Sequence, residues 1–291
     1  MKCKSVLFLF SLSVLGCGQT SISSQTESLQ FQSPVKYDDD AEEDEPRAAG
    51  GIQQQSGSGS DYFHCFESGG CVAPALSSSK NCLDGRDYNT TISDNGSGIL
   101  VLSFHGGEIE PGSSGVASAL ASRFHFNHYD FSAHGSDSCL NGLSDLRRLH
   151  ITATHFDDPA AVSIMQTHQK AVSIHGYSAS RSNHKGTICV GGANTAQVSA
   201  FISYVEKNQD SFTLYDVIPV NAATAEQVAG ADCSGLAGTS SKNLVNRVAG
   251  SAGGLQLEMN RAIKMDLLDP DPKFEALRNL VYGGVNAALT K

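Results

Sequence analysis

Residues 104–112 (FHGGEIEPG) bring together the side-chain types that bind metal ions. The segment contains one imidazole, His105, and two carboxylates, Glu108 and Glu110, directly after an apolar run. Its glycines permit tight turns, so His105 and one of the carboxylates are able to converge on one point. Zinc in hydrolytic sites is commonly held by two His and one Glu, with a fourth position left for water. The residues alone leave open which Glu takes part, and they require a second His.

His175 is the best candidate for the second imidazole. The sequence has ten His, but residues 171–176 (AVSIHG) repeat the pattern of an apolar strand that ends in His-Gly. Two neighbouring parallel strands of this kind present their His at the same edge of a sheet, where ligands gather in α/β folds. His150 and His155 flank a short stretch (ITAT) and are interpreted as supporting or surface residues.

Glu258 is the candidate for proton transfer. It lies in a late apolar run, residues 253–259 (GGLQLEM), where a buried carboxylate is costly without a task or a partner. Beside a zinc-bound water it would act as general base and then as proton donor to a leaving amine. Taken alone, the pattern favours the alternative, a structural Glu in a salt bridge.

Strands and helices alternate around these residues. We expect strands at residues 99–104, 149–153, 171–174, 187–190, 213–219 and 255–259. We expect helices capped by Ser113 or Ser114, opened by Asp158-Pro159, running from 195 to 208, and running from 272 to 289. The alternation predicts an α/β domain with a mixed, largely parallel sheet and helices on both faces.

The first 60 residues have a different character. Residues 1–17 join a basic start to an apolar run that is shorter than the roughly 20 residues of a membrane span, which predicts an export signal. The signal ends at Gly16-Cys17, which resembles a bacterial lipobox and predicts a lipid on Cys17. An ordinary signal peptide that contains a Cys is the alternative. Residues 18–60 are rich in Ser, Gln, Gly and acids and are expected to form a disordered tether.

Cysteine content and charge agree with an exported domain at residues 61–291. Six Cys lie there, an even number that allows up to three disulfides in an oxidising compartment: Cys65, Cys71, Cys82, Cys139, Cys189 and Cys233. The net charge of −10 argues against nucleic acid as a partner. Contact with a membrane is expected only through the lipid, so the protein is expected on the cell envelope, or secreted.

Six segments in the same order resemble the poly-γ-glutamate hydrolase family, which includes phage enzymes that cut γ-linked glutamate capsules. They span about residues 98–260 and read HGGEIE, LHIT with FDDP, SIHG, GG, NLVNR and GLQLE. The resemblance implies a zinc carboxypeptidase-like fold and one Zn²⁺ per site. It also implies hydrolysis of γ-glutamyl amide bonds, most simply endo-cleavage of poly-γ-glutamate by a zinc-activated water.

The family pattern assigns roles to individual residues. It reads His-Gly-Gly-x-Ile-Glu, which puts the metal ligand on Glu110, whereas the His-x-x-Glu spacing of ordinary zinc carboxypeptidases would select Glu108. His105 and His175 match the other two ligands, and Glu258 matches the catalytic base.

Arg247 is expected to bind a substrate carboxylate, with help from Asn246. A guanidinium binds a carboxylate through two parallel hydrogen bonds, and a γ-glutamyl polymer displays an α-carboxylate on every residue. A local basic patch of Arg181, Lys185 and Arg247 would offset the acidic balance of the chain. A structural Arg paired with a core acid is the alternative.

Two further functions remain open at the level of sequence. One is a zinc amidase or carboxypeptidase acting on cell-wall peptides, which also contain γ-linked glutamate. The other is a tethered surface protein that kept the fold, lost catalysis and serves only to bind.

Overall fold

The structure is a computed structural model that describes residues 88–133, 149–156, 158–182, 184–224, 227–228, 231–250 and 252–290. The expected signal and tether lie outside the described residues, as do Cys65, Cys71, Cys82 and Cys139. Among the residues that the structure describes, no helix has the length and apolar character needed to cross a membrane.

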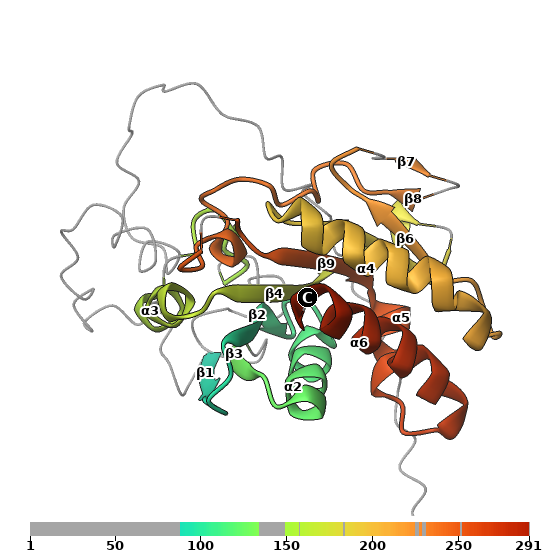
Figure 1. The fold of residues 1–291 in the computed structure, drawn as a ribbon, viewed down its shortest axis with the longest axis horizontal. Coiled ribbons are helices and arrows are strands. Elements are labelled where there is room, and N and C mark those ends of the chain that lie inside the picture. Colours follow the sequence, from blue (N-terminus) through green and yellow to red (C-terminus); the bar gives the residue numbers. More distant parts are fainter. Residues whose placement is uncertain are drawn as a thin grey trace, which may run out of the picture. The chain divides into compact units, whose positions relative to one another are not determined.

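The main sheet has the strand order β1-β3-β2-β4-β9-β5-β6 (Figure 1). Its strands are β1 (Tyr88–Ser93), β2 (Ile99–Gly107), β3 (Asn127–Ala133), β4 (Lys170–Tyr177), β5 (Thr187–Gly191), β6 (Ile218–Asn221) and β9 (Leu255–Asn260). Strands β3, β2, β4 and β9 are parallel, β1 is antiparallel to β3, and β5 is antiparallel to β9. A separate short ladder pairs β7 (Gln227–Val228) with β8 (Ala231–Asp232). The expected mixed, largely parallel sheet is confirmed.

Helices cover both faces of this sheet (Figure 1). The larger core cluster joins the sheet to α2 (Ser113–Phe124), α4 (Thr195–Asn208), α5 (Arg261–Leu268) and α6 (Glu275–Thr290). A second cluster on the opposite face joins it to α3 (Pro159–Thr167) and the short helix η5 (Leu244–Asn246). Three other single turns are η3 (Ala179–Arg181), η4 (Gln209–Ser211) and η6 (Pro272–Phe274).

Alternation along the central strands decides which side chains share a face. Ile174 of β4 and Leu257 of β9 belong to the cluster under α2, α4, α5 and α6. Their neighbours His175 and Glu258 therefore point to the other face, because successive strand residues alternate. Both side chains are buried. These two ionisable residues therefore lie on the face of the sheet opposite the larger helix layer.

Three local predictions were wrong. Residues 149–153, expected as a strand, form no strand, because the carbonyls of Ile151 and Ala153 accept hydrogen bonds from His105 and from the backbone of Leu244. Helix α2 begins after Gly112 without a side-chain cap, so neither expected serine caps it. Strand β6 begins at Ile218 rather than near residue 213.

The structure contains a disulfide between Cys189 and Cys233. It joins β5 to the loop that follows β8, and both cysteines are fully buried in a small cluster with Tyr177, Val220 and Leu236. One bridge of the expected set is thus present among the described residues.

Removing this bridge tests its contribution to stability. The variant Cys189→Ala/Cys233→Ala is expected to lower the free energy of unfolding by about 2–4 kcal/mol, because closing a long loop restricts the unfolded chain. Denaturant unfolding of wild type and variant under non-oxidising, non-reducing conditions measures the difference. Equal transition midpoints would show that the bridge does not stabilise the fold.

Candidate metal centre

A β-bulge near the end of β2 positions His105. Ser103 of β2 pairs with Asp130 of β3, and the next pair is Gly106 with Ser132. Between these two pairs β2 therefore contains one residue more than β3. The extra residue in β2 breaks the alternation of side chains, as bulges do next to functional sites. His105 can then reach β4, where its ring lies 4.9 Å from the ring of His175.

The loop after β2 brings Glu110 back to His105. The backbone N–H of Glu110 donates to the carbonyl of His105 at 3.0 Å. Ile109 is buried in the core, so this hydrogen bond and this side chain both anchor the loop. Gly107 has φ +67°, and a Cβ there would lie 2.2 Å from the carbonyl oxygen of Ala133. Only glycine satisfies both conditions without strain.

Three ligand-type side chains converge at this point. His105 Nδ1 lies 2.8 Å from Glu110 Oε1 and 3.2 Å from His175 Nδ1. His175 Nδ1 lies 3.6 Å from Glu110 Oε2. Tetrahedral zinc with its usual bond lengths spaces neighbouring ligand atoms roughly 3.3 Å apart. The three expected ligands are therefore brought together at the spacing that such an ion needs.

The hydrogen bonds of His105 explain why this set needs a cation. Its Nε2 lies 2.7 Å from the carbonyl oxygen of Ile151, which only accepts hydrogen bonds, so Nε2 carries a proton. In a neutral imidazole Nδ1 then has a lone pair, which faces a carboxylate oxygen of Glu110 and a nitrogen of His175. A metal ion removes the repulsion among these atoms. A protein carbonyl that orients a ligand His in this way is typical of metal sites.

Burial and neighbouring charges both shift the pKa values of His105 and Glu110. Burial lowers the pKa of His105, which favours the neutral imidazole. Burial by itself raises the pKa of the Glu110 carboxyl, but the nearby His105 and His175 outweigh it and hold that pKa well below its usual range. The carboxyl of Glu110 is therefore ionised, which is the state in which a carboxylate binds a metal ion.

Lys264 is a buried lysine whose side chain contacts the backbone of Glu110. It was not among the residues predicted from the sequence. Its Nζ donates to Ser113 Oγ at 2.8 Å and to the Glu110 carbonyl at 3.4 Å. Burial lowers the pKa of Lys264 to about 8, against the opposing effect of Glu110 and Glu258. A Cβ on Gly176 would lie 2.1 Å from this Nζ. A lysine in an amphipathic helix pattern gives no sign of such burial, since only the fold reveals it.

Glu258 lies beside His175. The two residues are register partners on the parallel strands β4 and β9, so their side chains are neighbours on one face. Gln256 Nε2 donates to Glu258 Oε1 at 3.0 Å, and Asn243 Nδ2 donates to Gln256 Oε1 at 2.8 Å. This chain of two amides holds one oxygen of the Glu258 carboxylate.

Arg247 and Asn246 are tied to the backbone around the centre. Arg247 donates to the carbonyls of Lys242 and Thr154, at 2.7 and 3.0 Å, and its side chain is half-buried. Asn246 Oδ1 accepts from two backbone N–H groups, and its Nδ2 donates to two carbonyls. The amide of Asn246 therefore holds the loop that carries Arg247. The substrate-binding role of both residues stays a prediction.

The other candidates lie at different places. Glu108 is exposed and lies outside the group of side chains that could hold a metal ion, which consists of His105, Glu110 and His150. Asp158 caps α3 by accepting from the N–H groups of Ala160 and Ala161. Arg181 donates to the carbonyl of Ser234, and Lys185 is paired with Asp266 at 2.6 Å, so these two cations already have protein partners.

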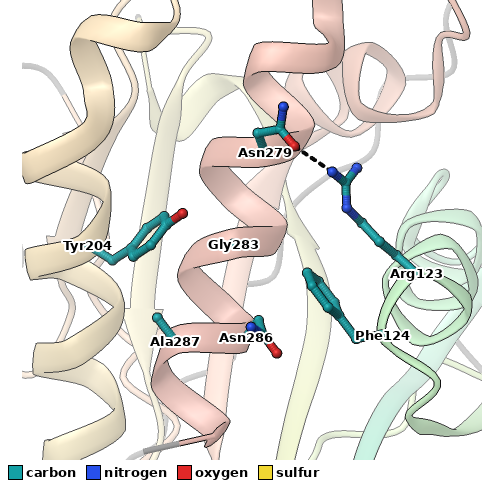
Figure 2. A pocket seen from close by; sticks show the side chains of 7 residues that line it. All are labelled: Arg123, Phe124, Tyr204, Asn279, Gly283, Asn286 and Ala287. Atoms are coloured by element: carbon teal, nitrogen blue, oxygen red, sulfur yellow. Dashed lines mark hydrogen bonds between the residues drawn. The ribbon is translucent and has the colours of Figure 1, made fainter.

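A groove of about 390 Å³ lies elsewhere, between helices α2, α4 and α6 (Figure 2). Arg123, Tyr204 and Asn279 are among its lining residues, and Arg123 donates to Asn279 at one end. None of the residues of the metal centre lines this groove, so it is separate from the chemistry described above.

The sequence pattern of the poly-gamma-glutamate hydrolase family matches residues 76–275. The chain belongs to this family. Two relatives from Bacillus subtilis (strain 168) are UPF0714 protein YndL, 39% identical over 98 residues, and UPF0714 protein YmaC, 32% identical over 179 residues. The aligned parts cover 34% and 60% of this chain, and 35% and 63% of the two relatives, less than two thirds of their own length.

Solved structures support the same fold. A bacteriophage poly-gamma-glutamate hydrolase aligns with a TM-score of 0.53 and 25% identity, covering 70% of this chain and 90% of that one. The zinc-free form of YndL aligns with a TM-score of 0.51 and 23% identity, covering 69% of this chain and 90% of that one.

Metal binding to the centre is testable by thermal unfolding. Zinc added to metal-free protein is expected to raise the Tm, because an ion that binds only the folded state contributes about 2.7 kcal/mol at 100 times its Kd. The variants His105→Ala and His175→Ala should lose this rise, since each removes a donor from the cluster. Glu108→Gln, at the exposed neighbouring carboxylate, is the control and should keep it. The site assignment fails if both His variants retain stoichiometric zinc.

Proposed function

We propose that this chain is a zinc-dependent hydrolase of γ-glutamyl amide bonds that cleaves poly-γ-glutamate internally. The observation that carries the proposal is the convergence of His105, Glu110 and His175, with the carboxylate of Glu258 on the adjacent strand. Two imidazoles and one carboxylate form a donor set that suits zinc. Membership of the poly-gamma-glutamate hydrolase family supports the same substrate class.

The proposed chemistry divides between the metal and the side chains. Bound zinc would supply Lewis acidity, which polarises an amide carbonyl and lowers the pKa of water. Glu258 accepts a proton from the attacking water at its carboxylate and returns it to the nitrogen of the leaving amine. Gln256 keeps that carboxylate turned toward the reaction through its 3.0 Å hydrogen bond.

Arg247 is proposed to position the polymer. It lies between the η5 segment and residues 149–156, so it is close in the fold to the carbonyl of Ile151 that orients His105. Each γ-linked residue offers an α-carboxylate, which a guanidinium binds with two parallel hydrogen bonds. Asn246 contributes indirectly, through the backbone groups that it holds near Arg247.

Export and lipidation at Cys17 remain proposals from the sequence, since residues 1–87 lie outside the described part of the chain. An envelope-anchored or secreted hydrolase would meet an extracellular polymer directly. The Cys189–Cys233 disulfide supports an oxidising location.

The decisive experiment is incubation of the protein with poly-γ-glutamate. Wild type is expected to shorten the polymer to intermediate lengths, and a chelator should abolish the activity. Glu258→Gln should retain zinc but lose about 10²–10⁴-fold in rate, because it can no longer take up the proton. Glu206→Gln, on the exposed surface of α4, is the matched control.

Other outcomes point to the rival functions. Release of single residues from chain ends, or cleavage of peptidoglycan fragments in preference to the polymer, would indicate a carboxypeptidase or amidase of cell-wall peptides. Zinc binding and polymer binding without any hydrolysis would indicate a binding protein. Unchanged hydrolysis by Glu258→Gln would refute the proposed mechanism.

The role of Arg247 is tested by steady-state kinetics. Arg247→Lys keeps the charge but loses the paired hydrogen bonds, so KM is expected to rise roughly 10-fold or more, consistent with about 1.5–3 kcal/mol for hydrogen bonds to charged groups. The kcat should change little. A purely structural Arg247 would instead lower the Tm and kcat together and leave KM unchanged.

A further inference from the structure

The two oxygens of the Glu110 carboxylate face different nitrogens. On one side, Oε2 accepts from the backbone N–H of Gly176 at 2.7 Å and lies 3.6 Å from His175 Nδ1. On the other side, Oε1 lies 2.8 Å from His105 Nδ1 and 3.4 Å from the Nε2 of His150. A fourth nitrogen thus faces the same carboxylate.

His150 satisfies the geometric conditions for a ligand. Its ligand atom and those of His105 and Glu110 all lie within 4.8 Å of one another, in a group that does not include His175. Its ring stands perpendicular to that of His105, with the centroids 4.3 Å apart. A distance of 3.4 Å to Glu110 Oε1 matches the roughly 3.3 Å that separates two ligands of one tetrahedral zinc ion.

Exposure distinguishes His150 from the other two imidazoles. Its side chain is 37% exposed, whereas those of His105 and His175 are 1% and 3% exposed. Substrate and water enter from solvent, so His150 stands on the side where a catalytic zinc keeps its open position.

We propose that His150 is a fourth, exchangeable ligand of the metal centre. It holds the metal ion in the resting enzyme and leaves that place to water or to the substrate carbonyl during turnover. The inference rests on the proposed function, because it assumes that His105, Glu110 and His175 bind the ion.

The local structure permits this exchange. Residues 149–156 form no helix or strand, and Leu149 and Ile151 are buried on either side of the exposed His150. The backbone is therefore anchored while the imidazole lies at the surface, so rotation about its own side-chain bonds is enough to withdraw it. His175, which is enclosed in β4, has no such freedom.

Substitution of the metal by Co²⁺ tests the coordination directly, since its visible absorption depends on the number and type of its ligands. The absorption spectrum of the Co²⁺ form is measured for wild type and for His150→Gln. The affinities of both proteins for Co²⁺ and Zn²⁺ are measured by competition with a chelator. The variant is expected to show the spectrum of a centre with more bound water. Loss of a residue that only hydrogen-bonds to a ligand lowers metal affinity roughly 10- to 100-fold. Loss of His150 as a ligand should lower the metal affinity at least as much.

His155→Gln is the matched control, because His155 is exposed on the same segment and lies outside the cluster. It should keep the spectrum and the affinity of wild type. If the spectrum of His150→Gln equals that of wild type, with or without a loss of affinity, His150 is not a ligand and the inference is overturned. If wild type itself binds neither metal, the proposed metal site fails instead.

Exchange is tested in the Glu258→Gln protein, which is expected to bind poly-γ-glutamate without cutting it. Adding the polymer to the Co²⁺ form of Glu258→Gln should shift the absorption spectrum. The double variant Glu258→Gln/His150→Gln should show no such shift. Bound polymer that leaves the spectrum unchanged would refute the exchange.

Discussion

The hydrogen bond between His105 Nε2 and the carbonyl of Ile151 decides the chemistry of the centre. Because that carbonyl can only accept, it fixes the proton on Nε2 and leaves the lone pair of Nδ1 facing Glu110. The bond in turn needs residues 149–156 to stay in place. Burial of Ile151 and the hydrogen bond from the Leu244 N–H to the Ala153 carbonyl keep them there. The position of the proton on His105 thus depends on residues 149–156 and on Leu244, which are distant in the sequence.

Parallel pairing in the middle of the sheet supplies the second constraint. With β4 between β2 and β9, His175 has His105, a proposed metal ligand, on one side and Glu258 on the other. The two proposed His ligands and the proposed base therefore occupy adjacent strands of one sheet, which favours a precise geometry. Lys264, one turn into the helix that follows β9, links the same region back to the Glu110 loop.

Much of this arrangement could be predicted from the sequence, because the His-Gly strand ends and the 195–208 helix follow simple periodic rules. The centre of the sheet followed from those patterns, and so did the proximity of His105 and His175, whereas the choice of Glu110 over Glu108 came from the family resemblance. Strand β3 was missed although Tyr129 and Phe131 alternate with polar residues, since His128 and Asp130 are unusual in a buried strand. The environments of Lys264 and His150 could not be predicted, because both depend on contacts between segments far apart in the chain.

The disulfide near Glu258 has a further consequence for the inorganic chemistry of the protein. Cys189 is the register partner of Glu258 on β5, so the bridge joins the strand next to this proposed base to the loop after β8. As a disulfide the two sulfurs are poor ligands, whereas free thiolates are among the strongest zinc donors in proteins. Oxidation of this pair would therefore remove two soft donors that could compete with imidazole and carboxylate for the proposed metal ion.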